Sequence, residues 1–491
     1  MSNSFLTASI PALAKLLRDK KISAKELCEL YFNRIKKHKE LNAYISIFEK
    51  ESLLQASLLD REGFSEKDPL MKGIPVSLKD LFMLSGTRTT CASKILENYI
   101  APYDATITKR LKEKKAIIVG KNNMDEFAMG SSNEYSYFGP VKNPWDTTRV
   151  SGGSSGGSAT AVSAGLSQIS FGTDTGGSVR LPASYTGILA LKPTYGRMSR
   201  YGVIAFASSL DQPGPMARNV HDLAIAYDAV AGFDKNDATT SSKKTENVYE
   251  YLLQENKKDL VKKTIGIPSS FIKEGVDKDV IKVFEESLAL IKKIGFKTVD
   301  IELPHTKYAL DVYYVISPGE ASANLSRYDG IRFGHRNKGF KDLESLYRGS
   351  RGEGFGEEVK RRIMLGTFVL SAGYYDAYFA KAAKVRTLIK TDFENAYKKC
   401  DAILMPVSPF TAFKLGEKMA SPLSMYLSDI FTISVNLAAV PSLAFPAGFS
   451  SQNLPIGMQL IGKHFDEKTL FGITRLIEME KQDCFNRVSV E

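Results

Sequence analysis

Val150-Ser-Gly-Gly-Ser154-Ser-Gly-Gly-Ser158 and, after a short apolar segment, Gly172-Thr-Asp-Thr-Gly-Gly-Ser178-Val-Arg180 form the stretch around which the chain is organised. Glycine lets the backbone approach a ligand closely, and serine supplies a hydroxyl that acts as nucleophile, donor or acceptor. The two clusters therefore predict a site where backbone N–H groups and hydroxyls converge on one small ligand.

Two other interpretations of this stretch are weaker. A Gly/Ser composition is also typical of flexible linkers, but residues 159–166 are small and apolar enough for a buried helix. Residues 167–172 alternate like a strand that enters a core. A phosphate-binding loop needs Gly-x-x-x-x-Gly-Lys-Ser/Thr, and no lysine follows these glycines. We therefore favour a structured site over a linker or a phosphate loop.

Composition sets the broad class of the protein. The 491 residues carry a net charge of +11, which favours encounters with acidic or nucleic-acid partners and says nothing about the fold. No signal peptide and no membrane-spanning run is indicated. The cysteines lie far apart without Cys-x-x-Cys spacing, which is typical of reduced thiols in a cytoplasmic protein and not of disulfides or a zinc site: Cys28, Cys91, Cys400 and Cys484.

Strand and helix patterns alternate along the chain. This alternation predicts an α/β fold whose sheet is covered by helices on both faces. We expect a single domain over residues 1–491, with a helical N-terminal part at 1–66 and a polar surface excursion at 233–262. Ser23 and Glu26 form a capping box, and Asp104 is the predicted cap of the next helix. The expected strands include residues 116–120, 188–191, 264–267, 297–303, 402–406 and 456–461, and the expected helices include 219–231, 278–294 and 466–480.

A serine nucleophile in this chain needs a base other than histidine. None of the five histidines lies near the Gly-rich stretch, and Gly-x-Ser-x-Gly has no good match. Lysine is an alternative base, but it accepts a proton only when its pKa is lowered by burial or by positive charge. Lys79 follows the apolar run 74–78, which would carry it into the core. The spacing alone leaves open an ordinary surface turn at Lys79–Asp80.

Three motifs together resemble the amidase signature family. They are Gly73-Ile-Pro-Val-Ser-Leu-Lys79-Asp, Gly152-Gly-Ser154-Ser-Gly-Gly-Ser and Gly172-Thr-Asp-Thr-Gly-Gly-Ser178-Val-Arg, in the family's order and at its spacing. The resemblance implies a central mixed sheet and a Ser–cis-Ser–Lys triad of Ser178, Ser154 and Lys79, with no metal. Backbone N–H groups around the nucleophile would hold the oxyanion: Thr175, Gly176, Gly177 and Ser178 itself.

More narrowly, nearly the whole chain resembles the glutaminase components of bacterial aspartyl/glutamyl-tRNA amidotransferases. Residues 192–197, 328–332 and 354–363 carry this resemblance. It implies that the chain hydrolyses glutamine, with Arg362 binding the α-carboxylate and Asp429 binding the α-amino group. Arg361 is the alternative to Arg362, because adjacent helical residues face about 100° apart and only one of them points inward.

The resemblance also implies partners. Two other subunits would complete a heterotrimer, and one of them would use ATP and magnesium to activate mischarged Glu-tRNA(Gln) or Asp-tRNA(Asn), which it would bind in the main. This chain shows no ATP-binding motif and is expected to hold no cofactor. Two alternatives remain open: a free-standing amidase that acts on another amide, and a basic RNA-binding scaffold with a vestigial site. The scaffold predicts lost catalytic residues, yet the three triad residues are present.

Overall fold

One long mixed sheet runs through the molecule. The computed structural model describes residues 4–254, 257–272, 275–485 and 487–490, and within them 11 strands form this sheet. Parallel pairing joins β2 to β3 and β6, whereas the strands from β6 to β11 are paired antiparallel. In spatial order the strands are β1 (Tyr44–Ile47), β3 (Ile117–Asn122), β2 (Pro75–Lys79), β6 (Ile169–Asp174), β8 (Gln212–Ala217), β7 (Leu189–Lys192), β12 (Ser442–Phe449), β13 (Pro455–Gly462), β11 (Ala402–Pro406), β9 (Thr264–Ile267) and β10 (Lys297–Asp300).

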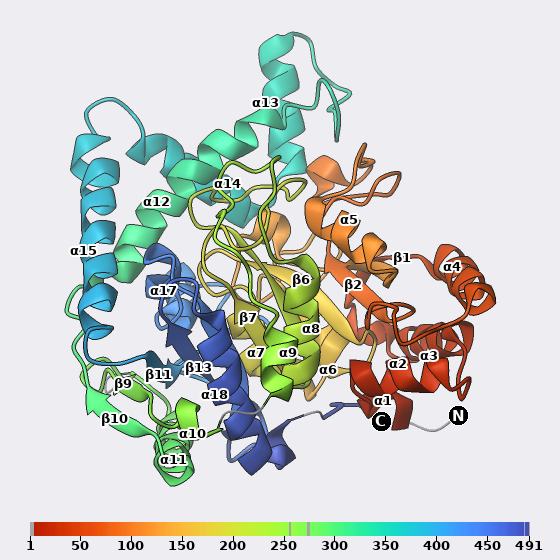
Figure 1. Ribbon diagram of the computed structural model, residues 1–491. Helices are drawn as coiled ribbons and strands as arrows, with labels where there is room; N and C mark the ends of the chain where they lie inside the picture. The colour runs from red at the N-terminus through yellow and green to blue at the C-terminus, as the bar shows by residue number, and fades with distance from the viewer. Residues whose placement is uncertain (1–3, 255–256, 273–274, 486, 491) are drawn as a thin grey trace.

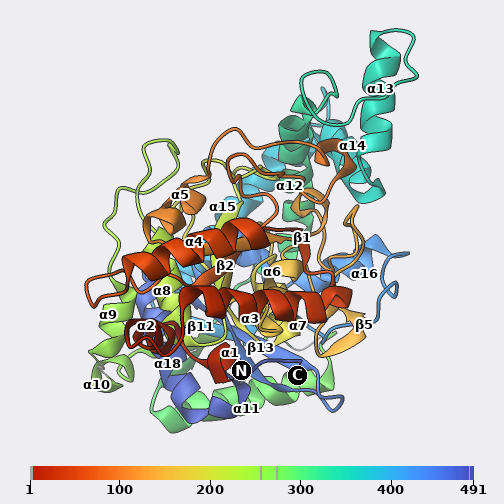
Figure 2. The same cartoon turned by 90° about the vertical axis from the view of Figure 1, so that its right-hand side faces the viewer.

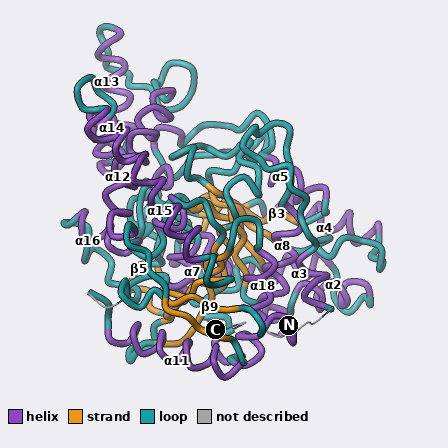
Figure 3. Tube along the Cα trace, turned by 60° about the vertical axis from the view of Figure 1, so that its left-hand side comes forward, coloured by secondary structure: helices purple, strands orange, loops and turns teal. Residues whose placement is uncertain are grey.

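Helices enclose this sheet, as Figures 1 and 3 show. The α/β fold with a mixed, helix-covered sheet is therefore confirmed. The main helices are α2 (Ile10–Arg18), α3 (Ala24–Lys37), α4 (Glu49–Glu62), α5 (Thr106–Glu113), α6 (Gly156–Ser163), α7 (Arg180–Thr186), α8 (Val220–Val230), α9 (Val248–Leu253), α10 (Lys257–Leu260), α11 (Lys278–Ile294), α12 (Ala309–Asn324), α13 (Leu343–Gly354), α14 (Glu357–Val369), α15 (Lys381–Ala396), α17 (Ile433–Leu437) and α18 (Glu467–Glu480).

The N-terminal part consists mainly of helices that lie side by side on one flank (Figure 2). The capping box of α3 forms as predicted, because the Ser23 hydroxyl accepts from the Glu26 N–H and the Glu26 carboxylate accepts from the Ser23 N–H. The excursion at 233–262 carries α9 and α10, which pack on α8 and α18, respectively. Residues 1–3 of the N-terminal part and 255–256 of the excursion lie outside the described residues. That the whole chain forms a single domain stays a prediction.

Several predicted boundaries agree with the structure, and one predicted cap is wrong. Strand β9 and helix α11 span the expected residues. Ala105, not Asp104, precedes α5, and no side chain caps that helix. The Asp104 carboxylate instead accepts from the Ser85 N–H at 2.8 Å and pairs with Lys112 at 2.7 Å. The Asp104 carboxylate therefore binds the Ser85 N–H and Lys112 and does not cap α5.

Candidate active site

The sheet brings the first and third motifs to one edge. Strands β2 and β6 are parallel neighbours, so their carboxyl ends lie at the same edge. Lys79 is the last residue of β2, and residues 175–178 follow directly after β6. Ser154 comes from the second motif, just before α6, and the peptide bond between Gly153 and Ser154 is cis. The three residues predicted as a triad therefore come from segments that converge on this edge.

The Lys79 ammonium is surrounded by hydroxyl groups. Its Nζ lies 2.7 Å from Ser154 Oγ, 2.9 Å from Ser155 Oγ and 3.1 Å from Thr173 Oγ1. The side chain is fully buried, as is that of Asp80, so the interpretation of Lys79–Asp80 as a surface turn is wrong. Burial lowers the pKa of Lys79 to about 7, although nearby carboxylates of Asp125 and Asp211 favour the charged form. Lysine of this pKa is neutral in a large fraction at neutral pH and is able to accept a proton.

Ser178 lies on a loop that carries several free backbone donors. Its carbonyl accepts from the Ser155 N–H at 3.1 Å, which ties the second motif to the third. Within the described part of the chain, the N–H groups of Gly176, Gly177 and Ser178 have no hydrogen-bond acceptor. The Thr175 N–H likewise has no acceptor among the described residues, and the Thr175 hydroxyl donates to Asp211 Oδ1 at 2.7 Å. Free N–H groups next to a serine are suited to hold an oxyanion.

The two glycines before Ser178 are required by crowding. A Cβ on Gly177 would lie 2.3 Å from Thr432 Oγ1, and its φ of +147° is one that L side chains rarely adopt. A Cβ on Gly176 would lie 2.8 Å from the Tyr313 ring. A side chain at either position would therefore force the loop that carries Ser178, or the side chain that it meets, to move.

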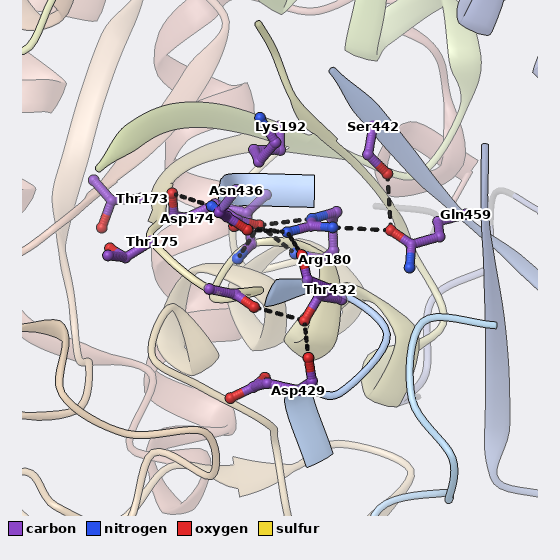
Figure 4. A network of polar contacts seen from close by, with 12 residues as sticks. Thr173, Asp174, Thr175, Arg180, Lys192, Asp429, Thr432, Asn436, Ser442 and Gln459 are labelled. Atoms are coloured by element: carbon purple, nitrogen blue, oxygen red, sulfur yellow. Dashed lines mark hydrogen bonds and ion pairs between the residues drawn. The ribbon is translucent and has the colours of Figure 1, made fainter. Parts of the chain in front are cut away.

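A buried polar network fixes the same loop from behind (Figure 4). Arg180 Nε lies 3.0 Å from Asp174 Oδ2 and Arg180 Nη2 lies 3.0 Å from Asp174 Oδ1, so the pair is bidentate. Burial alone would raise the pKa of Asp174, but Arg180 holds it below the usual value. Asn436 Nδ2 adds a hydrogen bond of 2.9 Å to the same carboxylate. Residues 174–180 are thus anchored at both ends by side chains that water does not reach.

The structure distinguishes the two candidate arginines on α14. Arg362 is buried, and its Nε donates to Glu358 Oε1 at 2.8 Å. Its guanidinium lies 5.3 Å from the Tyr314 ring centroid and 5.5 Å from that of Tyr426. The two terminal nitrogens of Arg362 have no hydrogen-bond partner among the described residues and remain available for a carboxylate. The Arg361 side chain is 47% exposed and pairs with Glu358 on the outer side.

Asp429 presents one free carboxylate oxygen near the Ser178 loop. Its Oδ2 accepts from the Ser131 hydroxyl, whereas its buried Oδ1 has no partner in the described structure. Oδ1 lies 3.0 Å from the position that a Cβ on Gly177 would occupy. Burial raises the pKa of Asp429 to about 7, and Arg362 is close enough to lower it. An ammonium group would satisfy this oxygen and favour the ionised form.

Sequence reasoning missed several residues of this site. Ser155 and Thr173 contact Lys79, Ser131 contacts Asp429, and Glu358 and Tyr426 support Arg362. Only Glu358 leaves a local signal, because it stands four residues before Arg362 on one helix face. The other contacts join distant segments and have no signature in the sequence.

Other types of site are absent from the part of the chain that the structure describes. No group of three or more His, Cys, Asp or Glu side chains is arranged to hold a metal ion there. All four cysteines are free and buried. Among the described helices, none combines the length and apolar character needed to cross a membrane.

Comparisons with known proteins agree with this geometry. The chain is 52% identical over 464 residues to the A component of the glutamyl-tRNA(Gln) amidotransferase of Methylobacillus flagellatus, covering 94% of each chain. It is 51% identical over 475 residues to the protein of that name from Geobacter sp., covering 96% of this chain and 97% of the relative. The crystal structure of the corresponding glutamyl-tRNA(Gln) amidotransferase component of Thermotoga maritima superposes with a TM-score of 0.81 at 42% identity, covering 100% of this chain and 99% of that one. The family model described as Amidase matches residues 26–471, and the chain therefore belongs to the amidase family.

Proposed function

We propose that this chain is the glutaminase component of a glutamyl-tRNA(Gln) amidotransferase. Relatives that carry this enzyme's name are 51–52% identical over nearly the full length. The observation that carries the proposal is the buried Lys79 ammonium, 2.7 Å from Ser154 Oγ, beside a loop with free N–H donors. The free oxygen of Asp429 and the free guanidinium nitrogens of Arg362 supply recognition for both ends of an amino acid.

In the proposed acylation step these groups act in sequence. Ser178 Oγ attacks the side-chain amide carbon of glutamine, its proton passes to Ser154, and the Ser154 proton passes to neutral Lys79. The carbonyl oxygen becomes an oxyanion that the N–H groups of Gly176, Gly177 and Ser178 stabilise, each by about 3 kcal/mol. When the C–N bond breaks, the same relay returns a proton to the nitrogen. Ammonia leaves, and a γ-glutamyl ester remains on Ser178.

Water completes the cycle. A water molecule takes the place of ammonia and gives up a proton through the same relay as it attacks the ester. The second tetrahedral intermediate collapses, the Ser178 oxygen is reprotonated, and glutamate leaves. Each turnover therefore consumes one glutamine and one water, and yields one glutamate and one ammonia.

Recognition of glutamine rests on its charged end. Arg362 would donate two hydrogen bonds to the α-carboxylate from its free terminal nitrogens, while Glu358 holds the guanidinium in place. Asp429 Oδ1 would accept from the α-ammonium. An amide without these two groups would leave the terminal nitrogens of Arg362 and Oδ1 of Asp429 without partners in a buried site, which disfavours other amides.

The ammonia would pass to a partner. We expect two other subunits, one of which activates mischarged Glu-tRNA(Gln) with ATP and magnesium. The tRNA would bind mainly to that partner. This chain would need no cofactor of its own, because serine, lysine and backbone N–H groups suffice for amide hydrolysis.

A purification from the native host tests this proposal. The tagged chain should retain two further subunits in equal amounts, and the complex should release ammonia from glutamine. Ser178→Ala should reduce that release at least about a thousand-fold, because the nucleophile is lost. A chain that purifies alone and prefers amides other than glutamine would be a free-standing amidase. Ammonia release that persists in Ser178→Ala would refute the assigned chemistry.

A further inference from the structure

Thr432 lies between Asp429 and the loop that carries Ser178. This residue directly precedes α17 and is fully buried. Its Oγ1 is 2.6 Å from the Gly176 carbonyl oxygen and 2.9 Å from the Asp429 carbonyl oxygen (Figure 4). A threonine hydroxyl has one proton and so donates to one of these oxygens at a time. The Asp429 carbonyl already accepts from the Thr432 N–H at 2.9 Å, whereas no other hydrogen bond to the Gly176 carbonyl occurs within the described residues.

The position of Thr432 is itself fixed by the buried network. Its carbonyl oxygen accepts from Arg180 Nη2 at 3.1 Å. The same nitrogen lies 2.6 Å from Asn436 Oδ1 and 3.0 Å from Asp174 Oδ1. Arg180 therefore links Thr432 to Asp174, the last residue of β6, which directly precedes the loop that carries Ser178. A hydroxyl held in this way is able to fix the direction of the group to which it donates.

The Gly176 carbonyl belongs to the peptide unit that contains the Gly177 N–H. A trans peptide is planar, so its C=O and N–H point in opposite directions. Two consecutive glycines have little intrinsic preference of φ and ψ, and the orientation of the peptide between them must come from outside contacts. Thr432 supplies such a contact on the carbonyl side. The N–H on the other side then stays aimed in one direction and has no acceptor among the described residues.

We propose that Thr432 is a positioning residue whose hydroxyl aligns the Gly176–Gly177 peptide, so that the Gly177 N–H is directed at the oxyanion formed from the substrate. The inference rests on the proposed function, because it requires an oxyanion at this loop. The Thr432 hydroxyl also lies next to the residue that would bind the substrate's α-amino group, because it contacts the backbone carbonyl of Asp429. It would therefore link the glutamine-binding carboxylate to the oxyanion donors. Thr432 itself does not touch the reacting atoms in this role.

Three variants of the purified complex test the proposal. Thr432→Val keeps the shape and removes the hydroxyl, and kcat for ammonia release should fall on the order of 100-fold, the effect of losing one oxyanion donor. KM for glutamine should change less than about three-fold, because the contacts that glutamine makes equally in the ground state and the transition state are retained. Thr432→Ser keeps the hydroxyl and should restore kcat to near the wild-type value. Ser434→Ala is the matched control, because it removes a buried hydroxyl on α17 that has no partner among the described residues.

A second readout separates alignment from folding. A glutamine analogue with an aldehyde in place of the amide would form a hemiacetal with Ser178, and its affinity should fall in parallel with kcat. The affinity for glutamate, which forms no oxyanion, should stay unchanged. If Thr432→Val does not give a cooperative thermal transition, Thr432→Ala replaces it under the same criteria.

Two results would overturn this assignment while leaving the proposed function in place. One is a kcat within two-fold of wild type in Thr432→Val when Ser178→Ala is inactive. The other is a rise in KM without a fall in kcat, which would mean that Thr432 acts only through the conformation of Asp429. Ammonia release that persists in Ser178→Ala would instead remove the proposed function itself, whatever Thr432→Val does.

Discussion

The pH dependence of ammonia release tests whether buried Lys79 is the base. Burial lowers the pKa of Lys79 from 10.5 to about 7. With a pKa of about 7, roughly half of the lysine is neutral at pH 7 and roughly one-tenth at pH 6. An exposed lysine with a pKa of about 10.4 is neutral in only about 1 molecule in 2,500 at pH 7. The buried environment therefore raises the fraction of usable base by about three orders of magnitude.

These fractions give the expected kcat profile. Because only neutral Lys79 accepts the proton, kcat at saturating glutamine should fall about five-fold from pH 7 to pH 6. From pH 7 to pH 8 it should rise less than about two-fold, since most of the lysine is then neutral. The ammonium group of bound glutamine keeps Asp429 ionised, so the titration of Asp429 should not contribute to the fall of kcat at acid pH.

The profile of kcat/KM should be steeper, because it reports the free enzyme. Burial raises the pKa of Asp429 to about 7, so protonation at acid pH removes the carboxylate that the ammonium needs. Two groups must then lose protons, and log(kcat/KM) should rise with a slope approaching 2 below pH 6, against a slope of 1 for log kcat. Asp429→Asn should lower the slope of log(kcat/KM) to 1 and leave the slope of log kcat unchanged.

Steady-state ammonia release between pH 5.5 and 8.5 is the assay, with circular dichroism at each pH to verify the fold. Lys79→Arg is the control, because arginine keeps a cation but is not deprotonated in proteins, and it should be inactive at every pH. A kcat that is independent of pH between 6 and 8 would refute the role of Lys79 as the base. An active Lys79→Arg enzyme would do the same.

Two further predictions concern binding and stability. Arg362→Ala should raise KM for glutamine at least about 30-fold through the loss of a charge-assisted bidentate pair, while Arg361→Ala, on an exposed side chain, should change it less than about three-fold; equal effects would contradict the assignment. Arg180→Met should lower the free energy of unfolding by about 3–5 kcal/mol, because it leaves Asp174 as an unpaired buried charge. Urea titration measures this, with Lys262→Met, whose side chain is 75% exposed, as the control expected to cost less than about 1 kcal/mol.

Local sequence determined much of the secondary structure. The capping box at Ser23 and the apolar periodicity of residues 278–294 act over three or four residues, and the structure reproduces α3 and α11. Local sequence does not indicate strand β8, because Gln212-Pro-Gly-Pro-Met-Ala217 contains two prolines, which local rules place at sheet edges. It lies between β6 and β7, where the Gly214 Cα approaches so closely that a Cβ would be 2.1 Å from the Leu191 carbonyl oxygen. Such a fit depends on a strand distant in the chain.

For the site, the sequence by itself determined the residue types and their order, because a nucleophile, a relay and glycine-rich turns are encoded in short contiguous motifs. Only the tertiary structure decided that Lys79 is buried among Ser154, Ser155 and Thr173, and that Arg362 faces inward while Arg361 faces out. The pKa of a lysine and the direction of an arginine depend on desolvation and on neighbours from distant segments. Those contacts exist only after the sheet has brought the carboxyl ends of β2 and β6 together.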